Sequence, residues 1–301
     1  MDYSLIEAIC TECGTAFEHN ALLKHYCSMK IGGACDILVK PGSEDVLCEL
    51  LSLCKSESIP FFILGKGTNV LFSDNGFRGV IILIGQDMGG ITVEQNKITA
   101  GAGAMLNAVC KTALEYSLSG AENLYGIPGT VGGALFMNAG AFGSEMKDIT
   151  VSCRYINERG ELSEMQAEDM ELSYRHSVFS KRDHVITSVT MRFSNGDKDA
   201  IKARMDEVLQ RRKDKQPLEF PSCGSTFKRP KNGFAAALIE ECGLKGFRIG
   251  GAEVSEKHSG FVINRGDATY GDIIKIVEHI KNTVLREKGI ELECEVITVD
   301  N

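Results

Sequence analysis

The sequence predicts an α+β protein. Short apolar and β-branched runs alternate with amphipathic helical segments in the first half of the chain. Three β-rich runs then follow one another between residues 149 and 193, which is typical of an antiparallel sheet. The C-terminal part combines two helical segments with short strands, as expected of a compact α/β unit. At roughly 100 to 200 residues per domain, the 301 residues can form two or three domains.

The elements of the first half include a helix that Ser43 can cap. Glu44 and Asp45 would occupy its first turn, where acidic side chains suit the helix dipole, and Pro60 would end the segment. Its apolar face consists of Val46, Leu47, Leu50, Leu51 and Cys54. After it we expect a strand at 61–64, a strand at 80–84, a hairpin of strands 91–93 and 97–100, and a helix from about 104 to 117.

The next part of the chain is rich in glycine. Seven glycines occur between Gly120 and Gly143 without a steady apolar period, so extended backbone is expected there rather than a helix. Gly243 is expected to end a later helix, and Thr269 with Asp272 forms a capping box for another. The elements expected after the glycines are strands at 149–156, 161–165, 184–193 and 260–264, helices at about 197–213, 234–242 and 270–288, and a closing strand at 290–299.

Charge and composition disfavour several classes of protein. Lys plus Arg is 33 and Asp plus Glu is 41, so the net charge of -8 disfavours nucleic acid and anionic membranes as partners. No apolar run approaches the roughly 18 residues of a membrane span, and the first residues lack the basic start of a secretory signal. Eleven scattered cysteines without such a signal indicate reduced thiols and a cytoplasmic protein. Cys10 and Cys13 form a lone CxxC pair without the further ligands of a zinc site, so no metal is expected.

A loop directly after the expected strand 61–64 contains two glycines: Gly65, Lys66, Gly67, Thr68 and Asn69. Glycines let backbone N–H groups converge on an anion, so this loop is either a phosphate cradle or a tight structural turn. It does not match a Walker loop, and Leu106 occupies the third glycine position of a Rossmann fingerprint that begins at Gly101. A second glycine-rich stretch at 127–143 favours the cradle, because two such stretches can hold an extended dinucleotide.

Seven motifs carry a family resemblance. They are GKGTNVLFSD from Gly65, YGIPGTVGGALFMNAGAFG from Tyr125, SYRHSVF from Ser173, CGSTFKRP from Cys223, GLKGFRIGGAEVS from Gly243, KHSGFVIN from Lys257 and LECEV from Leu292. In this order and spacing, from Tyr26 to Val296, the chain resembles the UDP-N-acetylenolpyruvoylglucosamine reductase (MurB) family of bacterial peptidoglycan synthesis.

The resemblance implies a domain plan. An N-terminal segment at 1–28 would precede a two-lobed FAD-binding domain of the vanillyl-alcohol-oxidase (PCMH) type at 29–195. The two lobes would comprise about 29–80 and 81–195. A C-terminal α/β substrate-binding domain would follow at 196–301, with a final strand that could return to the flavin lobe.

The resemblance also implies cofactors and binding residues. FAD would be held without a covalent bond, and NADPH would be the co-substrate. The implied FAD-binding residues lie in the two glycine-rich stretches: Gly65, Lys66, Gly67, Thr68, Asn69, Pro128, Gly129, Thr130, Gly132, Gly133, Asn138 and Gly140. Lys215 and Lys245 match positions for diphosphate-binding lysines. The implied enzyme, a cytoplasmic monomer, reduces UDP-N-acetylglucosamine enolpyruvate to UDP-N-acetylmuramate for cell-wall biogenesis, cell shape and cell division.

Three polar positions match the family's catalytic residues: Arg175, Ser225 and Glu295. Hydride addition to an enolpyruvyl ether builds negative charge on the carboxylate side, so the reaction needs a fixed cation and a proton donor. Arg175 can grip the carboxylate, Ser225 is the candidate donor to the carbon that receives no hydride, and Glu295 would assist in its protonated form. That form requires burial to raise the pKa of Glu295. Without the resemblance, we would interpret the three as a surface ion pair, a turn residue and a solvated strand position.

Two departures from the family pattern concern the site. Cys294 stands beside Glu295 where many relatives have proline, and the chain lacks the tyrosine-bearing substrate loop of one subgroup, so it is similar to the shorter second type.

An oxidase of the same flavin superfamily is an alternative, although the early glycine loop has no histidine for a covalent flavin. A protein that binds a nucleotide sugar without turnover is a second alternative, which the three catalytic positions disfavour.

Overall fold

The structure is a computed structural model and describes residues 2–300. The chain packs as two compact units. Unit 1 comprises the residues up to His19, Ile37–Lys66 and Gly79–Arg211. Unit 2 comprises Asn20–Asp36, Gly67–Arg78 and the residues from Arg212 onward. Two short N-terminal segments therefore pack with the C-terminal part of the chain rather than with the residues that flank them.

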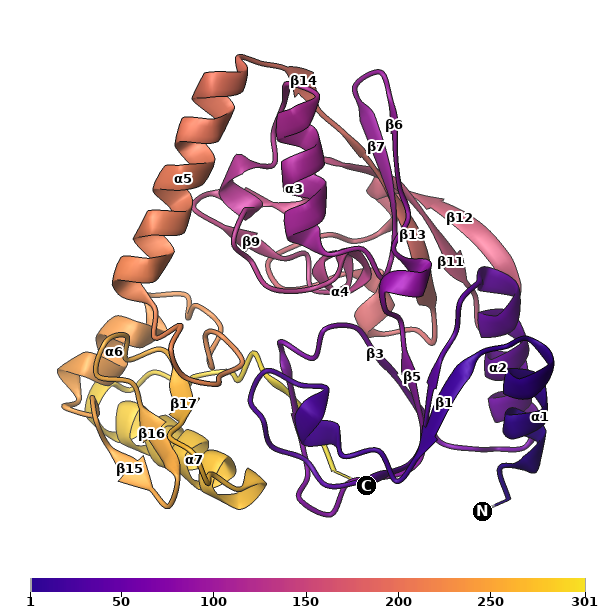
Figure 1. The fold of residues 1–301 in the computed structure, drawn as a ribbon. Coiled ribbons are helices and arrows are strands. Elements are labelled where there is room, and N and C mark those ends of the chain that lie inside the picture. Colours follow the sequence, from indigo (N-terminus) through magenta and orange to yellow (C-terminus); the bar gives the residue numbers. More distant parts are fainter. Residues whose placement is uncertain (1, 301) are drawn as a thin grey trace. The chain divides into compact units, whose positions relative to one another are not determined.

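Two sheets form most of the strand structure of unit 1 (Figure 1). The larger is antiparallel and has the order β12-β11-β13-β7-β6, which confirms the expected hairpin and the three antiparallel strands. The other has the order β1-β2-β5-β3, in which β3 pairs parallel with β5. The bounds are β1 Ala16–His19, β2 Cys35–Lys40, β3 Phe61–Leu64, β5 Phe77–Leu83, β6 Ile91–Glu94, β7 Lys97–Gly101, β11 Thr150–Ile156, β12 Leu162–Gln166 and β13 Val185–Arg192. Shorter pairs join β8 Leu118–Ser119 to β14 Ser194–Asn195 and β9 Gly140–Ala141 to β10 Ser144–Glu145.

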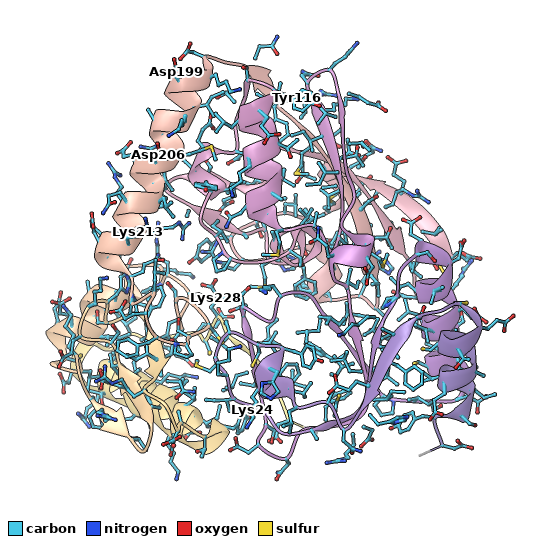
Figure 2. The ribbon with its side chains drawn as sticks, viewed as in Figure 1. Lys24, Tyr116, Asp199, Asp206, Lys213 and Lys228 are labelled. Carbon is cyan, nitrogen blue, oxygen red and sulfur yellow. The ribbon has the colours of Figure 1, made fainter. Side chains whose placement is uncertain are left out.

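The helices of unit 1 include the capped helix expected after Ser43. The Ser43 side chain accepts a hydrogen bond from the Val46 N–H at 3.3 Å, which confirms the cap. Charged side chains such as Asp199 and Asp206 project from α5 (Figure 2). The bounds are α1 Ser4–Glu12, α2 Glu44–Ser56, α3 Leu106–Glu115, α4 Val131–Phe136 and α5 Lys198–Lys215, the last of which ends in unit 2.

Helix α4 corrects the expectation of extended backbone throughout 120–143. Thr130 caps it, because its side chain accepts a hydrogen bond from the Gly133 N–H at 3.4 Å. A Cβ atom at Gly132 would lie 2.8 Å from the Cβ of Ala102, so glycine permits close packing of the helix at this point. A local cap and tertiary packing therefore outweigh the poor helix propensity of the glycines.

Unit 2 has a small sheet in the order β15-β16-β17. Helix α7 has the predicted capping box, since Thr269 accepts from the Asp272 N–H and Asp272 accepts from the Thr269 N–H, both at 3.1 Å. Met29, Ile31 and Leu71 share the core formed by α6 and α7, which explains why the two early segments belong to this unit. The bounds are β4 Val70–Phe72, β15 Arg248–Ile249, β16 Ala252–Val254, β17 Val262–Asn264, β18 Ile297–Val299, α6 Ala235–Glu241 and α7 Tyr270–Lys288.

The closing strand is shorter than expected. Only β18 is a strand within 290–299, and it pairs parallel with β4, which follows the first glycine loop. The preceding residues instead form an isolated antiparallel bridge between Cys294 and Phe227. The expected strand was therefore wrong for 290–296, where the backbone bonds with a loop that the sequence pattern did not identify as a partner.

Among residues 2–300, every helix is too short or too polar to cross a bilayer.

Candidate functional site

The start of the first glycine-rich stretch lies against the second stretch within unit 1. Gly65 follows β3 directly, and a Cβ atom built on it would lie 2.5 Å from the Oγ1 atom of Thr130. Only glycine allows this approach without a shift. Within the described part of the chain, no protein acceptor receives the backbone N–H of Gly65, Lys66, Gly129 or Thr130.

The lack of a protein acceptor for these four N–H groups bears on whether the loops fit a dinucleotide. Gly129 and Thr130 are buried, and Gly65 is half-buried, so their N–H groups need an acceptor that the protein does not supply. Convergent backbone N–H groups are a common means of binding phosphate. The residues present therefore fit the diphosphate of FAD both sterically and by hydrogen bonding.

The other candidate residues of the second stretch lie before, within and after α4. Pro128 is exposed before the buried Gly129, and Gly132 and Gly133 lie in the first turn of the helix. A Cβ at Gly140 would lie 2.5 Å from the carbonyl oxygen of Ser144, so a close hairpin follows the helix. The stretch thus combines a loop, a short helix and a tight hairpin.

Asn138 supports the turn that carries Arg175. Its side chain is fully buried, and Nδ2 donates to the Ser173 carbonyl at 2.8 Å. Oδ1 accepts the Lys147 N–H at 2.9 Å. The amide therefore holds protein segments together, which gives this candidate FAD ligand a structural role for its side chain.

Arg175 lies in a two-residue hairpin turn at 173–176. The first and last residues of the turn exchange two backbone hydrogen bonds of 3.1 Å. Arg175 has φ +53°, a left-handed conformation that is uncommon for residues other than glycine. Its Nη2 donates to the Gly140 carbonyl at 3.3 Å, and its Cζ lies 5.0 Å from the centroid of the Tyr174 ring. The guanidinium is thus held at the hairpin that ends the second glycine-rich stretch.

In unit 2, Gly67 packs tightly against an early segment of the chain. It has φ +64°, and a Cβ atom on it would lie 2.3 Å from the Tyr26 carbonyl oxygen and 2.8 Å from the Cα of Cys27. Its own carbonyl accepts the Ser28 N–H at 2.9 Å. Both the backbone conformation and the available space therefore require glycine here.

Ser225 and Glu295 lie on two chain segments that pair within unit 2. The segments form an antiparallel bridge, beside which the Glu295 N–H donates to the Thr226 carbonyl at 2.8 Å. Asn69, at the end of the first glycine loop, donates through Nδ2 to the Glu295 carbonyl at 3.0 Å. Ser225 is exposed and Glu295 is half-buried. Unit 2 thus brings together the segments that carry Ser225 and Glu295 and the end of the first glycine loop.

Cys294 leaves this arrangement intact. It opposes Phe227 in the bridge, and the flanking hydrogen bonds are donated by Glu295 and by Lys228 (labelled in Figure 2). Burial raises the pKa of the Cys294 thiol, so the side chain is neutral at pH 7. The residue beside Glu295 therefore adds no charge to the site.

The positive charges of Lys215 and Lys245 both affect the pKa of the His258 imidazole. Burial lowers the pKa of His258, and the positive charges of Lys245 and Lys215 lower it further. Lys215 is the last residue of α5, and the Nζ of Lys245 lies 2.7 Å from Glu240 Oε1. The ring of His258 has a hydrogen-bond partner, because its Nδ1 accepts the Gly260 N–H at 3.2 Å. The two lysines thus supply positive charge to one region of unit 2.

The candidate site residues divide between the two units. Arg175 belongs to unit 1, whereas Ser225, Glu295 and both lysines belong to unit 2. We did not single out Thr226 from the sequence, although it contacts the backbone of Glu295. A β-branched residue between a serine and a phenylalanine is typical of an ordinary strand, so no sequence signal distinguished it.

The described part of the chain holds no group of three or more His, Cys, Asp or Glu side chains suited to a metal ion. Burial raises the pKa of Cys10 to about 11, whereas Cys13 is exposed. A protonated thiol is a poor zinc ligand, so the chemistry of this CxxC pair also disfavours metal binding.

Comparison with protein families matches both parts of the chain. The model of the FAD binding domain matches residues 35–166. The model of the UDP-N-acetylenolpyruvoylglucosamine reductase C-terminal domain matches residues 216–299. The first match contains both glycine-rich stretches, including the hairpin at Gly140. The second match contains Ser225 and Glu295.

Similar proteins cover nearly the whole chain. The UDP-N-acetylenolpyruvoylglucosamine reductase of Clostridium novyi is 46% identical over 279 residues, 93% of this chain and 91% of the relative. That of Caldanaerobacter subterraneus is 46% identical over 277 residues, with 92% and 91% covered. The crystal structure of the same enzyme (MurB) from Thermus caldophilus aligns with a TM-score of 0.81 at 32% identity, over 95% of this chain and 100% of that one.

Proposed function

The chain belongs to the UDP-N-acetylenolpyruvoylglucosamine reductase (MurB) family, and on this basis we propose which of its residues carry out the reaction. It is an FAD-dependent oxidoreductase of peptidoglycan synthesis that uses NADPH. The proposed substrate is UDP-N-acetylglucosamine enolpyruvate, and the product is UDP-N-acetylmuramate. One hydride and one proton add across the carbon–carbon double bond.

One observation supports the proposal most directly. The Nδ2 of Asn69, in the loop assigned to FAD, donates to the carbonyl of Glu295, which the motifs assign to the reaction. A direct hydrogen bond between a cofactor loop and a candidate acid is expected where cofactor and substrate must meet. It is less expected of a protein that only binds a nucleotide sugar.

For the cofactor, we propose a binding region at about 29–195, of which residues 29–36 and 67–78 pack in unit 2. Its N–H groups at Gly65, Lys66, Gly129 and Thr130 would bind the diphosphate. Bound FAD supplies the hydride path from NADPH to the enolpyruvyl carbon. The other proposed FAD-binding residues are Gly67, Thr68, Asn69, Pro128, Gly132, Gly133, Asn138 and Gly140.

Three side chains would act on the substrate. Arg175 binds the carboxylate and stabilises the negative charge that develops there during hydride addition. Ser225 donates a proton from its Oγ to the carbon that receives no hydride. Glu295, in its protonated form, assists on the carboxylate side. Glu295 and Ser225 lie on paired segments, which brings their backbones close together and supports a shared role on one enolpyruvyl group.

We further propose that the region 196–301 binds the nucleotide sugar. Lys215 and Lys245 would neutralise its diphosphate, and this role is supported by their nearness to the same imidazole, that of His258. The enzyme would act as a monomer in the cytoplasm, where both NADPH and the nucleotide sugar occur.

Product analysis tests the function. Purified protein supplied with FAD, NADPH and the enolpyruvyl nucleotide sugar should yield a product heavier by two hydrogen atoms, detected by mass spectrometry. Oxidation of NADPH at the same rate with and without the sugar would contradict the assignment.

A further inference from the structure

Thr226 joins three chain segments of unit 2. It is 4% exposed, and its backbone N–H donates to the Gly260 carbonyl at 2.8 Å. Its Oγ1 accepts the Val262 N–H at 3.0 Å, and its carbonyl accepts the Glu295 N–H at 2.8 Å. One buried threonine therefore bonds to the start of β17 on one side and to the segment of Glu295 on the other.

The residues around Thr226 limit the ways in which Ser225 can be held. Gly224 has φ +75°, and before it the buried Cys223 donates through Sγ to the Val70 carbonyl at 3.3 Å. The first buried residue after Ser225 is Thr226. The exposed Ser225 therefore lies between two anchored residues, of which Thr226 is its direct neighbour and also bonds to Glu295.

The segment of Glu295 is fixed from two directions. Its N–H is bound by Thr226, and its carbonyl is bound by the Asn69 amide at 3.0 Å. Ser225 is one residue from Thr226, and Glu295 is one hydrogen bond from it. A shift of Thr226 against β17 would thus displace both side chains at once.

We propose that Thr226 is a positioning residue, whose hydroxyl oxygen keeps Ser225 and Glu295 in register for reduction of the enolpyruvyl group. The proposal rests on the function proposed above. Valine has nearly the same shape as threonine but no acceptor, so Thr226→Val would leave the buried Val262 N–H without a partner. Serine keeps the acceptor and removes only a methyl group.

The test separates the two half-reactions of the holoenzyme. Anaerobic stopped-flow absorbance at the flavin band measures reduction by NADPH first, and then reoxidation by enolpyruvyl UDP-N-acetylglucosamine. Thr226→Val should slow reoxidation by about tenfold to a hundredfold, because small displacements of reacting groups have effects of that size. Reduction by NADPH and the Kd of the sugar for the oxidised enzyme should change less than about threefold. Thr226→Ser should restore most of the reoxidation rate.

Two further measurements exclude a general effect on folding. Thr150→Val is the matched control in unit 1, where a buried threonine hydroxyl donates to the Met146 carbonyl at 2.8 Å, far in sequence from Ser225 and Glu295. The melting temperature of the Thr150→Val variant should fall about as much as that of Thr226→Val. Its rate of flavin reoxidation should stay at the wild-type value. The solvent deuterium isotope effect on reoxidation should rise in Thr226→Val, because transfer of the proton becomes slower.

The outcomes are distinguishable. If wild-type flavin is not reoxidised by the sugar, the proposed function fails. If the wild type turns over but Thr226→Val reoxidises at the wild-type rate, the positioning role fails while the function stands. Equal slowing of both half-reactions, or equal slowing in Thr226→Ser and Thr226→Val, would also overturn the role of the hydroxyl oxygen.

Discussion

The backbone N–H of Glu295 donates to the carbonyl of Thr226 at 2.8 Å, so the residue after Ser225 is bonded directly to Glu295. The two segments lie far apart in the sequence and pair only through the fold of unit 2. Asn69 binds the same residue from the other side. This three-way junction is where the proposed proton donor, the proposed acid and the proposed cofactor loop converge.

Replacement of Ser225 by alanine tests the proton donor. Ser225→Ala should leave flavin reduction by NADPH within about threefold of wild type and slow reoxidation by the substrate by about a hundredfold or more, as for loss of a general acid. Stopped-flow absorbance under anaerobic conditions measures both rates. Ser56→Ala, at an exposed serine of α2, is the control and should match wild type. A normal reoxidation rate in Ser225→Ala would remove the serine from the mechanism.

Replacement of Arg175 by lysine tests whether the guanidinium geometry matters. Lysine keeps the charge but loses the two-pronged contact with a carboxylate, so the substrate KM should rise by about tenfold while reduction by NADPH is unchanged. Arg175→Gln should be more severe, because the charge is lost as well. Steady-state kinetics with Arg159→Lys, an exposed turn residue, provides the control. The role would be refuted by identical KM values for wild type and Arg175→Lys.

Replacement of Gly67 by alanine tests the first glycine loop. The new Cβ would lie 2.3 Å from the Tyr26 carbonyl, at a residue with φ +64°, so the loop must move. We expect a loss of about 1 to 3 kcal/mol in the free energy of unfolding and weaker retention of FAD. Denaturant unfolding and flavin fluorescence after gel filtration measure the two effects. Gly42→Ala, where a Cβ meets nothing within 4 Å, should show neither.

His184 makes stability depend on pH. Its Nδ1 is buried and has no hydrogen-bond partner among the described residues, and its ring lies 4.8 Å from that of Tyr155. Burial lowers the pKa of His184 below its ordinary value of 6.5. As the pH falls, the unfolded chain therefore takes up the proton first, so stability that is present above pH 6.5 is lost towards the lower pKa of the folded state.

His184→Phe should accordingly raise the melting temperature more at pH 5 than at pH 8. Thermal unfolding of both proteins across this range measures the difference. An equal shift at both pH values would show that the gain comes from packing against Tyr155 rather than from removal of the titrating group.

Elements with local signals could be predicted from the sequence. The capping box of Thr269 and Asp272 and the left-handed Gly289, φ +67°, define both ends of α7. Ser43 marks the start of α2 in the same way. In each case a few adjacent residues determine where the helix begins or ends, and the structure agrees with the prediction made from them.

Elements that depend on distant partners could not be predicted. Helix α4 needs packing of Gly132 on Ala102, and the segment 290–296, expected as a strand, instead forms a bridge from Cys294 to Phe227. The four residues of β1 are all exposed, so no apolar alternation marks that strand. Tertiary pairing outweighs local propensity in all three elements.

The candidate site shows the same limit. Motifs named Arg175, Ser225 and Glu295, but not the hydrogen bonds from Asn69 and Thr226 that hold Glu295. Such supporting contacts lie between segments far apart in the chain. Asparagine and threonine are also common residue types, so Asn69 and Thr226 carry no chemical signal that marks them in the sequence.

The most direct measurement is the anaerobic absorbance of the purified, FAD-loaded protein, reduced with NADPH and then mixed with enolpyruvyl UDP-N-acetylglucosamine. We predict that the spectrum of oxidised flavin returns rapidly and in stoichiometric proportion to the added sugar. Flavin that stays reduced until oxygen is admitted would contradict the account and favour an oxidase.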